Sequence, residues 1–138
     1  MSTCTDPDVR VAPTSGLAVW AGRTLTAFAA LFLLFDGVAK VLKLAPVLEA
    51  SARLDVPEWV IPGLGVVLIA ATLVYAFPRT SALGAIVLTG YLGGATWAHL
   101  RMGGPVFPIL FPSLVAAMVW GGLYLREPRL RALVTLRW

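Results

Sequence analysis

Six side chains with chemically useful groups occur within or beside strongly apolar segments of the chain. They are Asp36, Lys40, Glu58, Tyr91, His99 and Arg101. Asp36 and Lys40 are four positions apart, the spacing at which an acid and a base form an ion pair on one helix face. His99 is the single histidine, and it follows Tyr91 by eight residues, about two helical turns. Histidine exchanges protons near neutral pH. Together, these acidic, basic and phenolic groups have the chemistry to bind a small polar ligand.

Two interpretations of the polar set are open at this stage. In the first, Asp36 and Lys40 form a structural ion pair at a helix end, while His99 and Arg101 mark where another helix leaves the lipid. In the second, the set forms an outward-facing pocket with Asp36 as the partner of His99. Such a pocket would take a quinone headgroup or another small polar ligand. Tyr91 would line its floor, with packing between helices as the alternative for that side chain.

The composition argues against several other chemistries. One histidine and one cysteine, Cys4 in a polar leader, are too few for a haem, copper or zinc site, so we expect no metal. Cys4 has no second cysteine to pair with, and we expect a free thiol. No Walker motif or glycine-rich dinucleotide motif occurs, so no cofactor is evident apart from a quinone. Ser113 has no acid or base nearby in its segment, which argues against a hydrolytic triad.

The segments that position these residues are long and uncharged. Of the 138 residues, 59% are hydrophobic and 13% are charged, against about 45–50% and about 25% in soluble domains. Each apolar segment reaches the roughly 20 residues that a helix needs to cross a bilayer. We therefore predict an all-α integral membrane four-helix bundle, whose spans cover residues 18–41, 59–78, 81–99 and 107–125.

The connection between the first and second spans has a helical pattern of its own. Val47, Leu48, Ser51 and Leu54 fall on one helical face, and Pro46 precedes them at a position that suits a first turn. The pattern predicts a short amphipathic helix in the membrane interface. An ordinary loop is the alternative.

Small residues and prolines predict how the spans pack. Gly90, Gly94 and Ala98 form a stripe on the third span. A stripe of small residues lets two helix backbones approach closely, and we favour a contact within the chain over one in a homo-oligomer. Gly103-Gly104-Pro105, followed by two further prolines, predicts irregular backbone at the entrance to the fourth span, beside the polar set.

Lysine and arginine predict the orientation of the bundle. The end that holds both termini carries seven of them, and the opposite end carries four. The positive-inside rule therefore places both termini in the cytoplasm. Residues 1–16 are then a polar cytoplasmic tail and residues 126–138 a basic one. We interpret the basic tail as a topology determinant, with contact to anionic lipid headgroups as the alternative. Nucleic-acid binding needs a basic soluble module, and we expect none.

Aromatic residues agree with this frame. Tryptophan and tyrosine favour the membrane interface because their rings are apolar and their N–H or O–H group seeks water. Near the predicted inner boundary lie Trp20, Tyr75, Trp120 and Tyr124, and near the outer one lie Trp59 and Trp97.

Four stretches of sequence together resemble the DoxX-like family of small four-span membrane proteins. They are FDGVAKVLKL, LDVPEWVIPGLG, FPRTSALGAIVLTGYLGGATWAHLRMGGP and FPSLVAAMVWGGLYLREPRLRAL, and the resemblance extends from Arg23 to Leu133. It implies a multi-pass bundle, usually of a bacterial inner (cytoplasmic) membrane. The family takes its name from a subunit of a terminal quinol oxidase that is also linked to thiosulfate:quinone oxidoreduction. It supplies no established catalytic residues, although Asp36, Lys40 and His99 lie in its better-matching segments.

These observations lead to three hypotheses about function. We expect an accessory membrane protein beside a redox or respiratory complex, with no intrinsic enzymatic activity. The alternative is a quinone-binding subunit of a quinol oxidase or thiosulfate:quinone oxidoreductase-type complex. A small-molecule carrier ranks third. Carriers usually have broken helices at the membrane midplane, whereas the irregular backbone predicted here lies near one surface. The expected partners are the lipid bilayer and subunits of a redox complex.

Overall fold

The computed structural model describes residues 15–134, which form α-helices, one 3₁₀ turn and no strand. The elements in chain order are α1 (Gly16–Val41), α2 (Ala45–Arg53), η1 (Glu58–Val60), α3 (Ile61–Ala76), α4 (Ser81–Arg101), α5 (Val106–Arg126) and α6 (Pro128–Val134). The all-α class and the four-helix bundle are thus confirmed. Cys4, nearly all of the 1–16 tail and the last residues of the 126–138 tail lie outside the described part of the chain.

The four long helices have the length of membrane spans. Three of them, α1, η1 with α3, and α5, are long and apolar enough to cross a bilayer. The fourth, α4, has 21 residues, which is about 30 Å at 1.5 Å per residue, but its glycines and threonines make it less apolar. Large side chains on the outside of the bundle are exposed, including Phe28, Phe35 and Ile86. An apolar exterior is what lipid contact requires.

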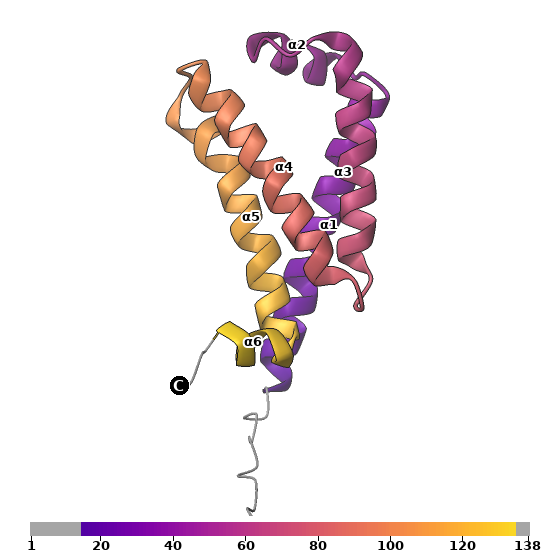
Figure 1. The fold of residues 1–138 in the computed structure, drawn as a ribbon, viewed down its shortest axis with the longest axis vertical. Coiled ribbons are helices and arrows are strands. Elements are labelled where there is room, and N and C mark those ends of the chain that lie inside the picture. Colours follow the sequence, from indigo (N-terminus) through magenta and orange to yellow (C-terminus); the bar gives the residue numbers. More distant parts are fainter. Residues whose placement is uncertain (1–14, 135–138) are drawn as a thin grey trace, which may run out of the picture.

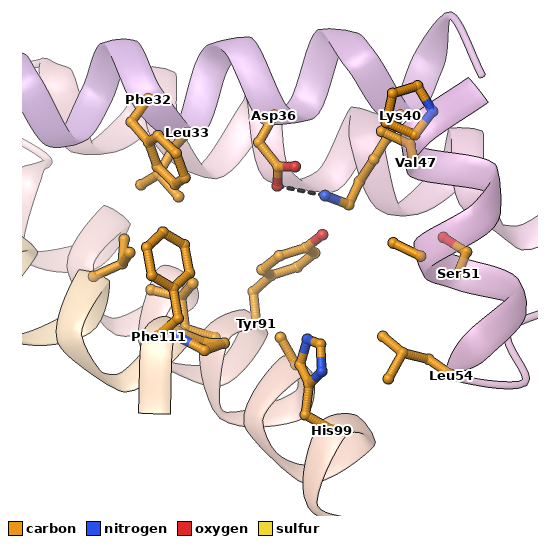
Figure 2. Close-up of a pocket in the computed structure, with 16 residues that line it drawn as sticks. Phe32, Leu33, Asp36, Lys40, Val47, Ser51, Leu54, Tyr91, His99 and Phe111 are labelled. Carbon is orange, nitrogen blue, oxygen red and sulfur yellow. Dashed lines mark hydrogen bonds and ion pairs between the residues drawn. The ribbon is translucent and has the colours of Figure 1, made fainter. Parts of the chain in front are cut away.

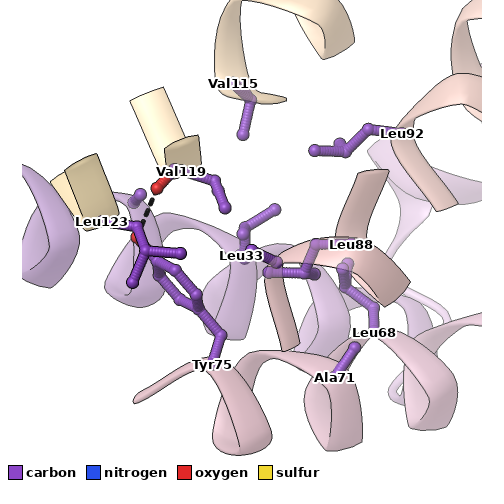
Figure 3. Close-up of a cluster of buried hydrophobic side chains, with 11 residues drawn as sticks. Leu33, Leu68, Ala71, Tyr75, Leu88, Leu92, Val115, Val119 and Leu123 are labelled. Atoms are coloured by element: carbon purple, nitrogen blue, oxygen red, sulfur yellow. Dashed lines mark hydrogen bonds between the residues drawn. The ribbon is translucent and has the colours of Figure 1, made fainter. Parts of the chain in front are cut away.

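The helices form a ring in which α1 packs against α3 and α5, and α4 packs against the same two helices. Leu33, Leu68, Leu88 and Val119 come from the four different helices and meet in the core, where each is at most 1% exposed (Figure 3). The short helices lie across the two ends, α2 at one and α6 at the other (Figure 1). A short helix between the first two spans is therefore confirmed.

Close helix packing occurs at the α6 end of the bundle, and also at the α2 end between α1 and α3, where an added Cβ at Gly37 or Gly65 would meet an atom of the other helix at 2.7 Å. A Cβ atom at Gly84 would overlap the backbone of Tyr75, and one at Gly122 would lie 2.7 Å from Thr26 Oγ1. On α4, by contrast, Gly90, Gly93 and Gly94 have no heavy atom within 4 Å of an added Cβ. The prediction that this stripe makes a contact within the chain is wrong, because these glycines face open space where α4 runs beside α5 but apart from α1 and α3 (Figure 1).

Two turns with unusual backbone flank α2. Lys43 has φ +50° and Asp55 has φ +55°, in the left-handed region that residues other than glycine seldom adopt. Both turns thereby reverse the chain over a few residues, and they hold α2 across the open end of the bundle. The predicted irregular backbone before the fourth span takes the form of a turn at Gly103, which has φ +64°.

Candidate functional site

A cavity of about 330 Å³ lies at the open end of the bundle, beneath α2. Its walls come from α1, α2, α4 and α5, whose segments are far apart in the sequence (Figure 2). Four of the six side chains singled out from the sequence line it. They are Asp36, Lys40, Tyr91 and His99.

The polar groups of the cavity converge from two helices. Lys40 donates a hydrogen bond to Asp36 Oδ2, so these two side chains form an ion pair along α1. Tyr91 and His99 belong to α4 on the opposite wall, and both side chains extend toward that ion pair (Figure 2). Neither the Tyr91 hydroxyl nor the His99 ring has a hydrogen-bond partner among residues 15–134. The cavity therefore presents donors and acceptors that the described residues leave available.

Apolar and aromatic side chains form the rest of the wall. Phe32 and Phe111 meet edge to face, with ring centroids 5.6 Å apart, and both line the cavity. Val47 and Leu54 cover it from α2, so the apolar face of that short helix is turned inward (Figure 2). Pro112 also lines the wall and lies inside α5. Because proline has no backbone N–H, the carbonyl one turn earlier lacks its usual helical partner.

Glu58 and Arg101 do not line the cavity. Glu58 accepts a hydrogen bond from Lys43 Nζ at 3.1 Å, and Arg101 Nη2 lies 3.4 Å from Asp55 Oδ2. Both pairs are solvent-exposed, and each includes one of the two residues with positive φ beside α2. The structure therefore brings four of the predicted residues together and uses the other two to fasten the turns around the helix that covers the cavity.

Tyr75 has a buried role that its place in the sequence did not indicate. This side chain is 0% exposed, so the expectation that its hydroxyl reaches water at the interface is wrong. Its hydroxyl donates a hydrogen bond of 2.9 Å to the Val119 carbonyl (Figure 3), and Arg126 lies over its ring at 5.5 Å. The neighbouring Gly84, whose backbone approaches Tyr75 closely, is the sequence signal that could have located it.

Residues 15–134 contain no group of three histidine, cysteine, aspartate or glutamate side chains that could hold a metal ion. The chemistry of the cavity is thus that of an ion pair, a phenol, an imidazole and aromatic walls. Such a site can bind a small ring compound by stacking and hydrogen bonds.

Four long helices with an apolar exterior define a multi-pass α-helical membrane protein. Residues 24–122 match the DoxX-like family, and the chain belongs to that family. This confirms the resemblance drawn from the sequence. No curated protein and no solved structure matches the chain.

Proposed function

We propose that the cavity under α2 binds the ring of a quinone or quinol, and that the protein serves as an accessory, ligand-holding subunit of a membrane redox system without activity of its own. The observation that carries this proposal is that Tyr91 and His99 line the same cavity from α4. Both have hydrogen-bonding groups without a partner in the described chain, and both face an apolar-walled cavity that also holds the Asp36–Lys40 pair.

The polar groups suit a ring with oxygen substituents at opposite edges. A quinone carbonyl accepts hydrogen bonds, and Lys40, Tyr91 and His99 can donate them. A quinol hydroxyl donates, and the Asp36 carboxylate can accept. Asp36 and Lys40 stand on the α1 wall, and Tyr91 and His99 stand on the α4 wall opposite. One ring between these walls would therefore be held at both edges.

The apolar walls suit the ring and its tail. Phe32 and Phe111 provide aromatic surface, on which a flat ring packs favourably. The volume of about 330 Å³ lies at the small end of the range for ligand pockets, which favours a headgroup with its tail outside. Phe107, exposed beside Phe111 on α5, offers apolar surface along which such a tail would run into lipid.

The distribution of charge supports an orientation in which both termini lie in the cytoplasm and the cavity opens toward the outer half of the inner membrane. In this arrangement the polar groups stand within a few helical turns of the surface, where charged side chains are tolerated better than at the bilayer centre.

A binding titration tests the proposal. A short-tailed ubiquinone analogue added to the purified protein in nanodiscs should bind saturably, at one site per chain, above the background of empty nanodiscs. His99→Ala and Tyr91→Phe should each weaken binding about fivefold to tenfold, the effect of one lost hydrogen bond. Asp36→Asn should weaken binding of the quinol form more than that of the quinone.

The matched control is Arg101→Gln, which removes a charge at the same end of the bundle but outside the cavity. This variant should bind as the unaltered protein does. If no saturable binding occurs, or if Arg101→Gln weakens binding as much as His99→Ala, the cavity is not a quinone site. The accessory role has a separate test, because tagged protein purified from native membranes should bring subunits of a redox complex with it.

A further inference from the structure

A second cavity, of about 450 Å³, lies at the opposite end of the bundle from the quinone-site candidate. It is formed where the turn between α3 and α4 meets the end of α5 and the short helix α6. Its lining includes Arg79, Ser81, Leu123, Glu127, Arg129 and Leu133.

Two arginines that line this cavity have side chains available to a ligand. Arg79 and Arg129 come from different elements, and neither has a hydrogen bond or an ion pair among residues 15–134. Nearby arginines are engaged instead. Arg131 donates to the carbonyls of Tyr124 and Leu125, both at 2.7 Å. The cavity therefore presents two guanidinium groups, whose planar arrays of donors match the oxygens of a phosphate group.

The same cavity has an apolar side. Leu123 is buried in the core, and Leu133 of α6 is 71% exposed beside the arginines. A free inorganic ion would use the guanidinium groups and leave this apolar surface uncovered. A ligand with a phosphate at one end and hydrocarbon at the other would use both.

Glu127 also lines the cavity, so the walls carry two positive charges and one negative charge. A headgroup with a net negative charge would balance the remaining positive one. A headgroup that also has hydroxyl groups could donate a hydrogen bond to the Glu127 carboxylate. A headgroup with a net charge of zero would leave the positive charge unbalanced.

We propose that this cavity is a binding site for one anionic phospholipid, whose phosphate lies between Arg79 and Arg129 and whose chains cover Leu133. The turn between α3 and α4 and the helix α6 thus both bind the same lipid molecule. It does not depend on the proposed quinone site, which lies at the other end of the bundle and shares no residue with it.

Native mass spectrometry tests the site directly. The full-length protein in detergent is offered an equimolar mixture of phosphatidylglycerol, phosphatidylethanolamine and phosphatidylcholine. We expect one phosphatidylglycerol molecule to be retained in preference to the other two. The double variant Arg79→Gln with Arg129→Gln should lose about thirtyfold in this preference, because each basic group near an anionic lipid surface contributes about 1 kcal/mol to the attraction.

Two further variants control for charge and for folding. Arg53→Gln removes an arginine that is likewise exposed and without a partner, but that lies on α2 at the other end, and it should keep the full preference. Arg79→Lys with Arg129→Lys should keep most of it, since the charges remain. Arg79 and Arg129 are both exposed, so their replacement should leave the thermal unfolding midpoint in detergent unchanged. If the double glutamine variant fails to fold, the two single variants should each show part of the loss.

Three results would overturn the proposal. The first is that the double glutamine variant keeps its preference for phosphatidylglycerol, or that Arg53→Gln loses as much. The second is that phosphatidylethanolamine is retained in preference to phosphatidylglycerol. The third is that inorganic phosphate alone binds at the site and displaces the lipid at millimolar concentration, which would make the free ion its ligand.

Discussion

The two ends of the bundle differ in whether α4 is in close contact with the helices opposite it. At the α6 end, Gly22, Gly84 and Gly122 allow backbones to touch, and an added Cβ at any of them would meet another atom at 2.9 Å or less. At the α2 end, α1 and α3 stay in close contact through Gly37 and Gly65, but three glycines of α4 face open space, and a cavity separates α4 from α1. The α6 end is therefore the packed end, where α4 lies against α3, and the α2 end is the open end, where α4 stands apart from α1.

Polar groups are treated differently at the two ends. Tyr75 buries its hydroxyl and satisfies it with the Val119 carbonyl, so its polarity serves packing. Tyr91 keeps a hydroxyl that no described residue satisfies, in a cavity large enough for a ligand. In this bundle the candidate site is marked by polar groups that both lack a partner among residues 15–134 and line a cavity; Arg126 Nε at the packed end is also without a partner, but it is buried.

The largest effect should come from adding one methyl group at the packed end. In Gly84→Ala the new Cβ would overlap the backbone of Tyr75, which cannot move aside as a flexible side chain can. We expect a loss of about 3 kcal/mol in the free energy of unfolding. Gly90→Ala, on the same helix but in open space, should be neutral or stabilise the helix by up to about 1 kcal/mol. Unfolding midpoints in detergent measure both, and equal effects would remove the distinction between the ends.

A smaller effect should follow from removing one buried hydroxyl. Tyr75→Phe keeps the ring under Arg126 but loses the 2.9 Å hydrogen bond to the Val119 carbonyl. We expect a loss of about 1 kcal/mol, the usual net value of such a bond, or about 0.6 kcal/mol as found on average within membranes. Tyr124→Phe is the matched control, because its hydroxyl has no hydrogen bond to the described residues, and its stability should not change.

At the open end, removing a charge should affect stability less than at the packed end. The side chains of Lys40 and Asp36 are 19% and 34% exposed, so the lysine can turn toward the cavity when its partner is lost. We expect Asp36→Asn to reduce the free energy of unfolding by less than about 1 kcal/mol, whereas breaking a fully buried pair costs about 3–5 kcal/mol. The unfolding midpoint in detergent measures this effect. A loss as large as that of Gly84→Ala would make the ion pair a structural element instead.

The smallest effect should come from the ion pair that fastens the turn after α2. The side chains of Arg101 and Asp55 are 60% and 75% exposed, and pairs of this kind contribute about 0–1 kcal/mol. Arg101→Gln should leave the unfolding midpoint within experimental error, and high salt should have equally little effect. A clear drop in the midpoint would show instead that the turn around α2 depends on this pair.

Much of the fold could be predicted from the sequence because the relevant properties are local. A run of about 20 apolar residues forms a membrane helix wherever it occurs, so α1, α3, α4 and α5 follow from composition. The short helix α2 follows from its own apolar face and Pro46. The ion pair of Asp36 with Lys40 follows from their spacing on one helix.

The candidate site could be predicted only in part. Helix direction places Asp36, Glu58, His99 and Arg101 at one end of the bundle, but it does not say which of them face inward. Glu58 and Arg101 turned out to bind residues in nearby turns. The stripe at Gly90 and Gly94 was predicted to pack, and it does not.

The sequence by itself determined that this protein is a bundle of four apolar helices with its few polar groups gathered toward the ends. Only the tertiary structure decided that the bundle is closed around Tyr75 and open around Tyr91. The physical reason is that burial depends on the angle at which helices cross. That angle is set by contacts between residues far apart in the chain, such as Gly84 with Tyr75 and Gly122 with Thr26.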